Sequence, residues 1–130
     1  MNYRGIQYFF YRLPGSEQLT SKDMKDLFTK LTKLKHVDIS ECKKGTTDMT
    51  VTALANNNPD LEYLAIDECE LVTGKSIKTI ADKCGKLYHL SLDGCYQVND
   101  PAMVKIATNC TKLKYLSLSL CSTVKVKSKI

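Results

Sequence analysis

The chain lacks any apolar run long enough to cross a lipid bilayer. A membrane-spanning helix needs roughly 18 or more consecutive apolar residues, and the longest aromatic cluster here is only Tyr8-Phe9-Phe10-Tyr11. The N-terminus also lacks a basic stretch followed by an apolar core and a small-residue cleavage site, which is the pattern of a secretory signal. We therefore expect neither a membrane span nor export.

The sequence also lacks a Cys-x-x-Cys pair, although it contains 6 cysteines. That spacing is typical of zinc and redox sites, so the cysteines must be interpreted from their positions. The 130 residues, with 43% apolar and 25% charged residues, are ordinary for one globular domain. A net charge of +5 raises the question of nucleic-acid binding, which depends on where the lysines lie.

A nine-residue segment recurs four times, at residues 34–42, 61–69, 87–95 and 113–121. Each copy has apolar residues at its first, fourth and sixth positions and cysteine at its ninth. The copies begin 27, 26 and 26 residues apart, and such a fixed period is the signature of a solenoid built from stacked units. Apolar residues between the copies follow the i, i+3, i+4, i+7 spacing of one helix face, as in Ile77, Ile80, Ala81 and Cys84.

Each unit is therefore predicted to be a short strand, a turn and a helix of about ten residues. Thr20, Thr73 and Asn99 stand just before the expected helices, where a side-chain oxygen can accept hydrogen bonds from free amides. Counting back 26 residues from Leu34 gives a degenerate first unit. It places Tyr8, Tyr11 and Leu13 at the apolar strand positions, Ser16 at the cysteine position, and Met24, Leu27 and Leu31 on the helix face.

We expect one domain over residues 1–130. Residues 1–33 form a capping repeat, 34–112 three regular repeats, and 113–130 an incomplete repeat with a basic tail. Terminal repeats are often atypical because one of their sides faces water.

The pattern over residues 8–124 resembles the cysteine-containing leucine-rich repeat of F-box/LRR proteins. The resemblance implies an α/β leucine-rich-repeat solenoid (horseshoe), with parallel strands on the concave face and helices on the convex face. It also implies a non-catalytic protein-interaction module, most like the substrate-recognition domain of an F-box/LRR ubiquitin-ligase component. An F-box itself is not recognisable. Leu13-Pro14 followed by Leu27-Phe28 and Leu31 is a faint echo with the wrong spacing.

The alternative function is that of a structural subunit in a large assembly. The repeats are equally similar to those of a leucine-rich subunit of the ciliary dynein regulatory complex. The corresponding location is cytoplasmic for the first function, and cytoskeletal or ciliary for the second.

The candidate partner-binding surface follows from strand alternation, since successive side chains point to opposite faces. With positions four and six in the core, positions three, five and seven face the concave side. Position three contributes a column of rings and the later positions an acidic stripe. The expected binding residues are Phe10, His36, Asp38, Tyr63, Asp67, Glu68, His89, Asp93 and Tyr115. The alternative for the rings is that cross-strand aromatic pairs simply stabilise a sheet.

The expected partner is another protein with a basic or aromatic segment, rather than nucleic acid or a membrane. The lysines fall on the helices, on the loops after them and on the tail, away from the rings. We expect no metal and no cofactor, because the backbones of His36 and His89 are about 10 Å apart across an intervening strand. Asp67 and Asp93 have a spacing that glycosidases use, but an exposed acidic stripe accounts for them better.

Cys42, Cys69, Cys95 and Cys121 form one column at the ends of the strands. Cysteine behaves as a small buried hydrophobe, so we expect free, buried thiols and a reducing compartment. The last unit has a strand but too little sequence for a helix. Either Lys125, Lys127 and Lys129 protect its open edge by charge, or Leu116, Leu118 and Leu120 mark a surface at that C-terminal edge that a partner or missing sequence covers.

Overall fold

The computed structural model describes residues 5–10, 19–121 and 123–125. Within these residues strands and helices alternate strictly along the chain. The elements are β1 Tyr8–Phe10, α1 Ser21–Lys30, β2 His36–Asp38, α2 Asp48–Asn57, β3 Tyr63–Ala65, α3 Gly74–Lys83, β4 His89–Ser91, α4 Asp100–Asn109 and β5 Tyr115–Ser117. No helix in this described part is long and apolar enough to span a membrane.

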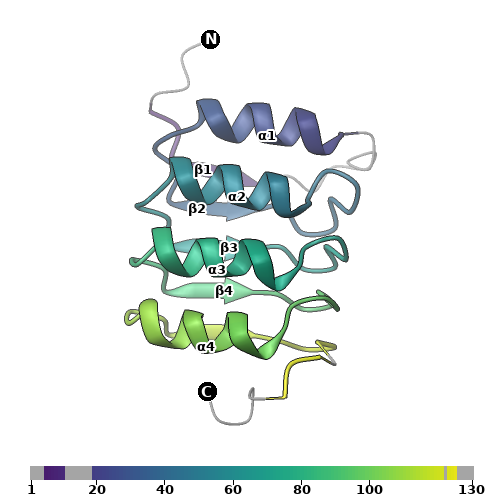
Figure 1. Cartoon of the computed structure of the whole chain (residues 1–130). Coiled ribbons are helices and arrows are strands. Elements are labelled where there is room, and N and C mark those ends of the chain that lie inside the picture. The colour runs from purple at the N-terminus through teal and green to yellow at the C-terminus, as the bar shows by residue number, and fades with distance from the viewer. Residues whose placement is uncertain (1–4, 11–18, 122, 126–130) are drawn as a thin grey trace.

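The strands form one parallel sheet in the order β1-β2-β3-β4-β5, which is their order in the sequence. The register is regular: His36 pairs with Tyr63, Tyr63 with His89, and His89 with Tyr115. The helices stack side by side in a second layer over one face of the sheet (Figure 1). Each unit therefore adds beside the previous one, and the structure confirms the predicted leucine-rich-repeat solenoid.

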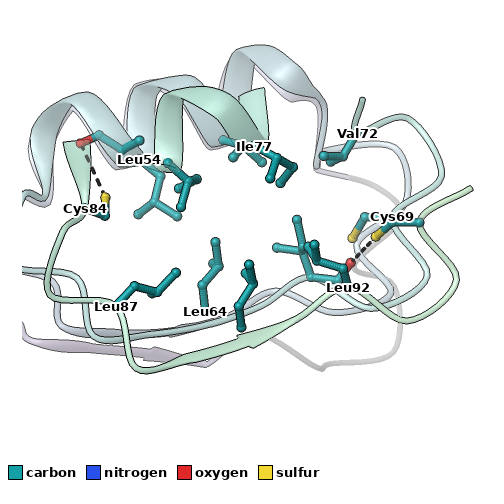
Figure 2. Packing of buried hydrophobic residues seen from close by; sticks show 14 of the residues in the cluster. Leu54, Leu64, Cys69, Val72, Ile77, Cys84, Leu87 and Leu92 are labelled. Carbon is teal, nitrogen blue, oxygen red and sulfur yellow. Dashed lines mark hydrogen bonds between the residues drawn. The ribbon is translucent and has the colours of Figure 1, made fainter. Parts of the chain in front are cut away.

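The core lies between the two layers and follows the repeat. Strand positions four and six are fully buried at Val37, Ile39, Leu64, Ile66, Leu90 and Leu92. Leu54 and Ile77 reach down from the helices towards Leu64 and Leu87 (Figure 2). Each such fully buried side chain stabilises the fold by about 1.5–3 kcal/mol, and residues of all the regular units belong to one continuous cluster. A single unit would leave this apolar face exposed to water.

The helix starts agree with the sequence. The side chains of Thr20, Thr73 and Asn99 each accept a hydrogen bond from a first-turn amide of α1, α3 and α4. At α1, Asp23 also accepts from the backbone amide of Thr20 and completes a capping box. These caps satisfy amides that have no partner inside the helix, so the three predicted N-caps are confirmed.

The first strand departs from the expected register by two residues. Tyr8 pairs with His36 and Phe10 with Asp38, so that Tyr8, and not Phe10, occupies position three. Counting back 26 residues was wrong because 28 residues separate Tyr8 from His36. The additional length lies between β1 and α1, since every strand from β2 onwards begins six residues after the preceding helix ends, as β2 does after α1.

The core position expected for Tyr11 is taken instead by Phe9. Its ring packs edge-on against the ring of Phe28 in α1, with the centroids 5.4 Å apart. Tyr11, Leu13 and Ser16, which were expected in the same unit, lie outside the described residues.

Candidate functional site

The position-three side chains form a continuous stack of rings across the sheet, here called the ring column: Tyr8, His36, Tyr63, His89 and Tyr115. His89 lies between Tyr63 and Tyr115, at centroid distances of 4.0 and 4.1 Å and with nearly parallel planes. His36 stacks on Tyr63 at 5.7 Å, and Tyr8 is tilted against His36 at 5.0 Å.

The ring column lies on the face of the sheet opposite the helices. Position four points into the core, so position three must point the other way. The three inner rings are half-buried, and the two end rings are more open, with Tyr8 59% and Tyr115 50% exposed. Four of the five expected position-three rings are therefore in place, with Tyr8 in the position predicted for Phe10.

The expected acidic stripe has a different geometry. Asp67 Oδ1 accepts hydrogen bonds from the hydroxyl of Ser91 at 2.6 Å and the amide of Asp93 at 3.0 Å. One unit further along, Asp93 Oδ1 accepts from the hydroxyl of Ser117 and the amide of Ser119. Each carboxylate thus joins its own unit to the next one, and it is not the freely solvated group that the sequence suggested.

Asp38 was expected on the exposed surface, and that expectation is wrong. It is only 4% exposed, and its Oδ1 accepts from the amide of Ser40 at 3.0 Å. A short side chain at position five lies below the tops of the neighbouring rings, so it is covered even though it points away from the helices. Ala65 and Ser91, at the same position, are buried in the same way.

Glu68 is half-buried, and its backbone is left-handed with φ of 62°. Its carboxylate lies over the next unit, so close that a Cβ added to Gly94 would be 2.6 Å from Oε1. Gly94 also has a positive φ of 74°, so both space and backbone conformation favour glycine there. Glu62 Oε1, which the sequence analysis did not select, lies 3.7 Å from His36 Nε2.

A second feature that sequence reasoning missed is a lysine-lined hollow of about 570 Å³ at the start of β4 and β5, here called the lysine hollow. Its lining residues are Glu62, Lys86, Tyr88, Lys112 and Lys114. Tyr88 lines the hollow and also meets the ring of His36 edge-on, with the ring centroids 6.2 Å apart. The lysine hollow therefore borders the ring column. The expectation that the positive charge lies only away from the rings was therefore wrong. The sequence did offer a signal for this hollow. Position two of each unit directly precedes the ring, and Glu62, Tyr88 and Lys114 at that position all line the hollow.

The cysteines are core residues, as predicted. All six are buried, and the thiol of Cys95 donates to the carbonyl of Ile66 at 3.1 Å, while that of Cys121 donates to Leu92 at 2.9 Å. Burial raises the pKa of Cys69 and of Cys84 to about 12. Thiols with such a high pKa are poor nucleophiles at neutral pH.

The electrostatics of the ring column depend on burial. Desolvation between its two tyrosine neighbours lowers the pKa of His89, and Asp67 and Asp38 oppose this shift. His89 is therefore a neutral aromatic ring at pH 7, which suits stacking better than a cation would. Among the described residues, no group of three or more His, Cys, Asp or Glu side chains is placed to hold a metal ion.

Comparison with known proteins identifies the fold. No protein-family model matches the chain, and no curated protein matches it. A chain in the crystal structure of the Rad7 and Elc1 complex in yeast superposes with a TM-score of 0.86 and 19% sequence identity. The match covers 100% of this chain and 32% of the yeast chain, so the present sequence spans about a third of that protein's length. At this identity the likeness concerns the fold.

Proposed function

We propose that the chain is a non-catalytic binding module that holds another protein on the ring column. The observation that carries this proposal is the stack of five rings, which is open to solvent at both ends. It lies on the face of the sheet opposite the four helices that the structure describes. Aromatic side chains dominate binding hot spots because they bury a large area with little loss of side-chain entropy. Planar groups of a partner, either aromatic rings or arginine guanidinium groups, suit such a stack.

The carboxylates along one side of the ring column favour a basic or aromatic segment there, while the lysine hollow borders the column near the starts of the strands. Asp67 and Asp93 contribute negative charge along one side, although their oxygens already accept hydrogen bonds within the sheet. The two carboxylates therefore attract a basic segment at long range more than they contact it directly. Binding should weaken as salt is added, because exposed charges are screened over about 8 Å at physiological ionic strength.

Within this function we propose substrate recognition in an F-box/LRR ubiquitin-ligase system, in the reducing cytoplasm. The repeat resemblance supports this setting, and the fold match to a chain in a two-protein complex supports the coarser role of a protein-binding module. Buried thiols with raised pKa values are consistent with a reducing compartment.

The test is affinity purification of partners with the whole chain as bait, followed by comparison of two variants. Tyr63→Ala with His89→Ala removes the centre of the ring column. Tyr96→Ala removes an exposed tyrosine from the loop before α4 and serves as the control. We expect the double variant to retain the circular dichroism spectrum and lose at least tenfold in affinity, about 1.4 kcal/mol, while Tyr96→Ala binds normally.

Normal binding by the Tyr63→Ala/His89→Ala variant would place the partner elsewhere and refute the proposal. The identity of the captured proteins distinguishes the settings. Ubiquitin-ligase components and their substrates support the first, whereas axonemal proteins support a structural subunit.

A further inference from the structure

The outer edge of β5 carries a groove of about 610 Å³, lined by residues 113–119. This groove shares Lys114 with the lysine hollow, so the edge of β5 and the basic depression are continuous. We propose that an extended segment of a partner protein adds to this edge as a further parallel strand, with acidic residues at its N-terminal end in the lysine hollow. This site uses the backbone edge of β5 and the lysine hollow, and it adjoins the ring column at Tyr115, which also lines the groove.

The inner strands show which backbone groups an added strand would meet. The amides of Ile66 and Glu68 donate to carbonyls of β4 and its following turn, at 3.0 and 2.7 Å. Leu92 and Gly94 donate in the same way to Ser117 and Ser119, both at 2.9 Å. The equivalent amides of the last unit belong to Leu118 and Leu120. A parallel strand would offer them carbonyls two residues apart, as β3, β4 and β5 do for the strands that precede them.

The side chains along this edge are mixed in polarity, and Tyr115 and Leu120 are the large apolar ones that are exposed. Leu120 is 66% exposed and has a φ of 62°, a left-handed conformation that a bulky residue seldom adopts. The preceding units have Glu41, Glu68 and Gly94 at this position. The left-handed conformation is therefore a feature of the repeat, and in the last unit it carries a leucine that is exposed to solvent. An added strand would cover both Leu120 and Tyr115.

The charges at the start of β5 decide the chemistry of the partner. Lys86 is paired with Asp60 at 2.7 Å, but Lys112 and Lys114 have no ion-pair partner among the residues described. Because these two lysines precede β5, they lie where a parallel segment begins. The net charge of +5 opposes pairing of two copies through this edge and favours an acidic segment.

The binding test uses fluorescence anisotropy of the whole 130-residue chain with a labelled synthetic peptide of about nine residues, a strand-length probe. The probe has three acidic residues followed by alternating valine and threonine. Its first control has the reversed sequence. Two further peptides are N-methylated on alternate residues, one set on each side of the extended chain. We expect the probe to bind with a salt-dependent Kd, the reversed peptide to bind at least tenfold more weakly, and only one of the two methylated peptides to lose binding.

The protein variants test the lysine hollow. Lys112→Glu with Lys114→Glu should raise the Kd of the acidic peptide about tenfold or more, because charge reversal replaces attraction by repulsion. Lys75→Glu with Lys78→Glu on α3 makes the same change in net charge away from the edge and should bind within about twofold of the parent.

Several outcomes would overturn the proposal. They are equal binding of the forward and reversed peptides, equal loss in both methylated peptides, or an unchanged Kd in the Lys112→Glu/Lys114→Glu chain. A stable dimer that the peptide does not dissociate would assign the edge to a second copy. A chain that ends at Lys125 is a further test. If it binds the probe at least tenfold more tightly, residues 126–130 compete for the edge of β5, and the edge would be assigned to them. Loss of partner capture by Tyr63→Ala/His89→Ala leaves this site unaffected, so the two proposals fail separately.

Discussion

At the scale of single residues, the cysteine thiols are the most nucleophilic side chains by type, and burial keeps them unreactive. The thiols of Cys69 and Cys95 donate to backbone carbonyls of the preceding unit, and burial raises the pKa of both. Cysteine fits position nine because it is nearly apolar and still has a weak donor. Serine would be smaller and more costly to desolvate.

Thiol reactivity tests this interpretation. In the native protein at pH 8 we expect a disulfide reagent to modify all six cysteines slowly, since the thiolate is the reactive form and burial suppresses it. In denaturant without reductant, alkylation followed by mass measurement should show six modified thiols. Fewer than six would contradict the prediction of free thiols, and rapid native labelling would contradict their burial.

His89 makes stability depend on pH. Its folded pKa lies below the usual 6.5 because burial disfavours the charged ring. Stability from this residue is complete above about pH 6.5 and falls as the pH drops, because the unfolded chain then binds a proton that the folded chain resists. Thermal unfolding between pH 7.5 and 5 should show a decline that His89→Phe reduces. An identical pH profile in His89→Phe would count against it.

At the scale of elements, side-chain hydrogen bonds join neighbouring units in addition to the apolar core. Asp48, at the start of α2, accepts from the amide and hydroxyl of Thr73 and from the hydroxyl of Ser76 in α3. At the other end of the helices, Asn58 accepts from the amide of Leu34 at 2.7 Å and donates to Leu54. Directional bonds of this kind hold neighbouring units in register, which apolar contacts alone do not.

Asp67→Ala tests the inter-unit bonds of the sheet. It removes the acceptor for the Ser91 hydroxyl and the Asp93 amide, and we expect a loss of about 1–3 kcal/mol in the free energy of unfolding, because hydrogen bonds to charged groups contribute that much. Glu70→Ala is the control, since Glu70 is exposed and lies 3.8 Å from Lys43. Its effect should stay below about 0.5 kcal/mol. Urea unfolding that gives equal losses for both variants would contradict the assignment.

At the scale of the whole molecule, the first and the last described units of the solenoid differ. The N-terminal unit has its own helix, α1, which packs against α2. In the described part of the chain, β5 is followed by no helix. Leu116 is consequently only half-buried, whereas Leu64 and Leu90 at the same position are fully buried. The stability of the stack should therefore decrease towards β5, as nearest-neighbour coupling in repeat proteins predicts.

Native hydrogen exchange measures this difference. We expect the amides of residues 115–120 to exchange faster than those of residues 63–67, because the former have a neighbouring strand on one side only. Adding the acidic peptide probe should slow exchange at residues 115–120 and leave exchange at residues 63–67 unchanged. Equal protection of the two segments in the isolated chain would mean that the terminal unit is self-sufficient.

The sequence by itself determined the repeat, the helix caps and most of the ring column. These features depend on local spacing: apolar residues at fixed positions, Thr20, Thr73 and Asn99 directly before the helices, and His36, Tyr63, His89 and Tyr115 one strand apart. Within a regular parallel stack, one unit fixes the placement of the next, so local pattern is sufficient.

Only the tertiary structure decided the rest, because it depends on contacts between units. Tyr8 replaced Phe10 in the ring column because the β1–α1 connection is longer than a constant period allows. The carboxylates of Asp67 and Asp93 point towards the next unit because that unit offers them hydroxyl and amide donors. The lysines gathered beside the rings because stacking brings equivalent positions of neighbouring units together, and the charge of a single unit does not reveal a surface that several units build.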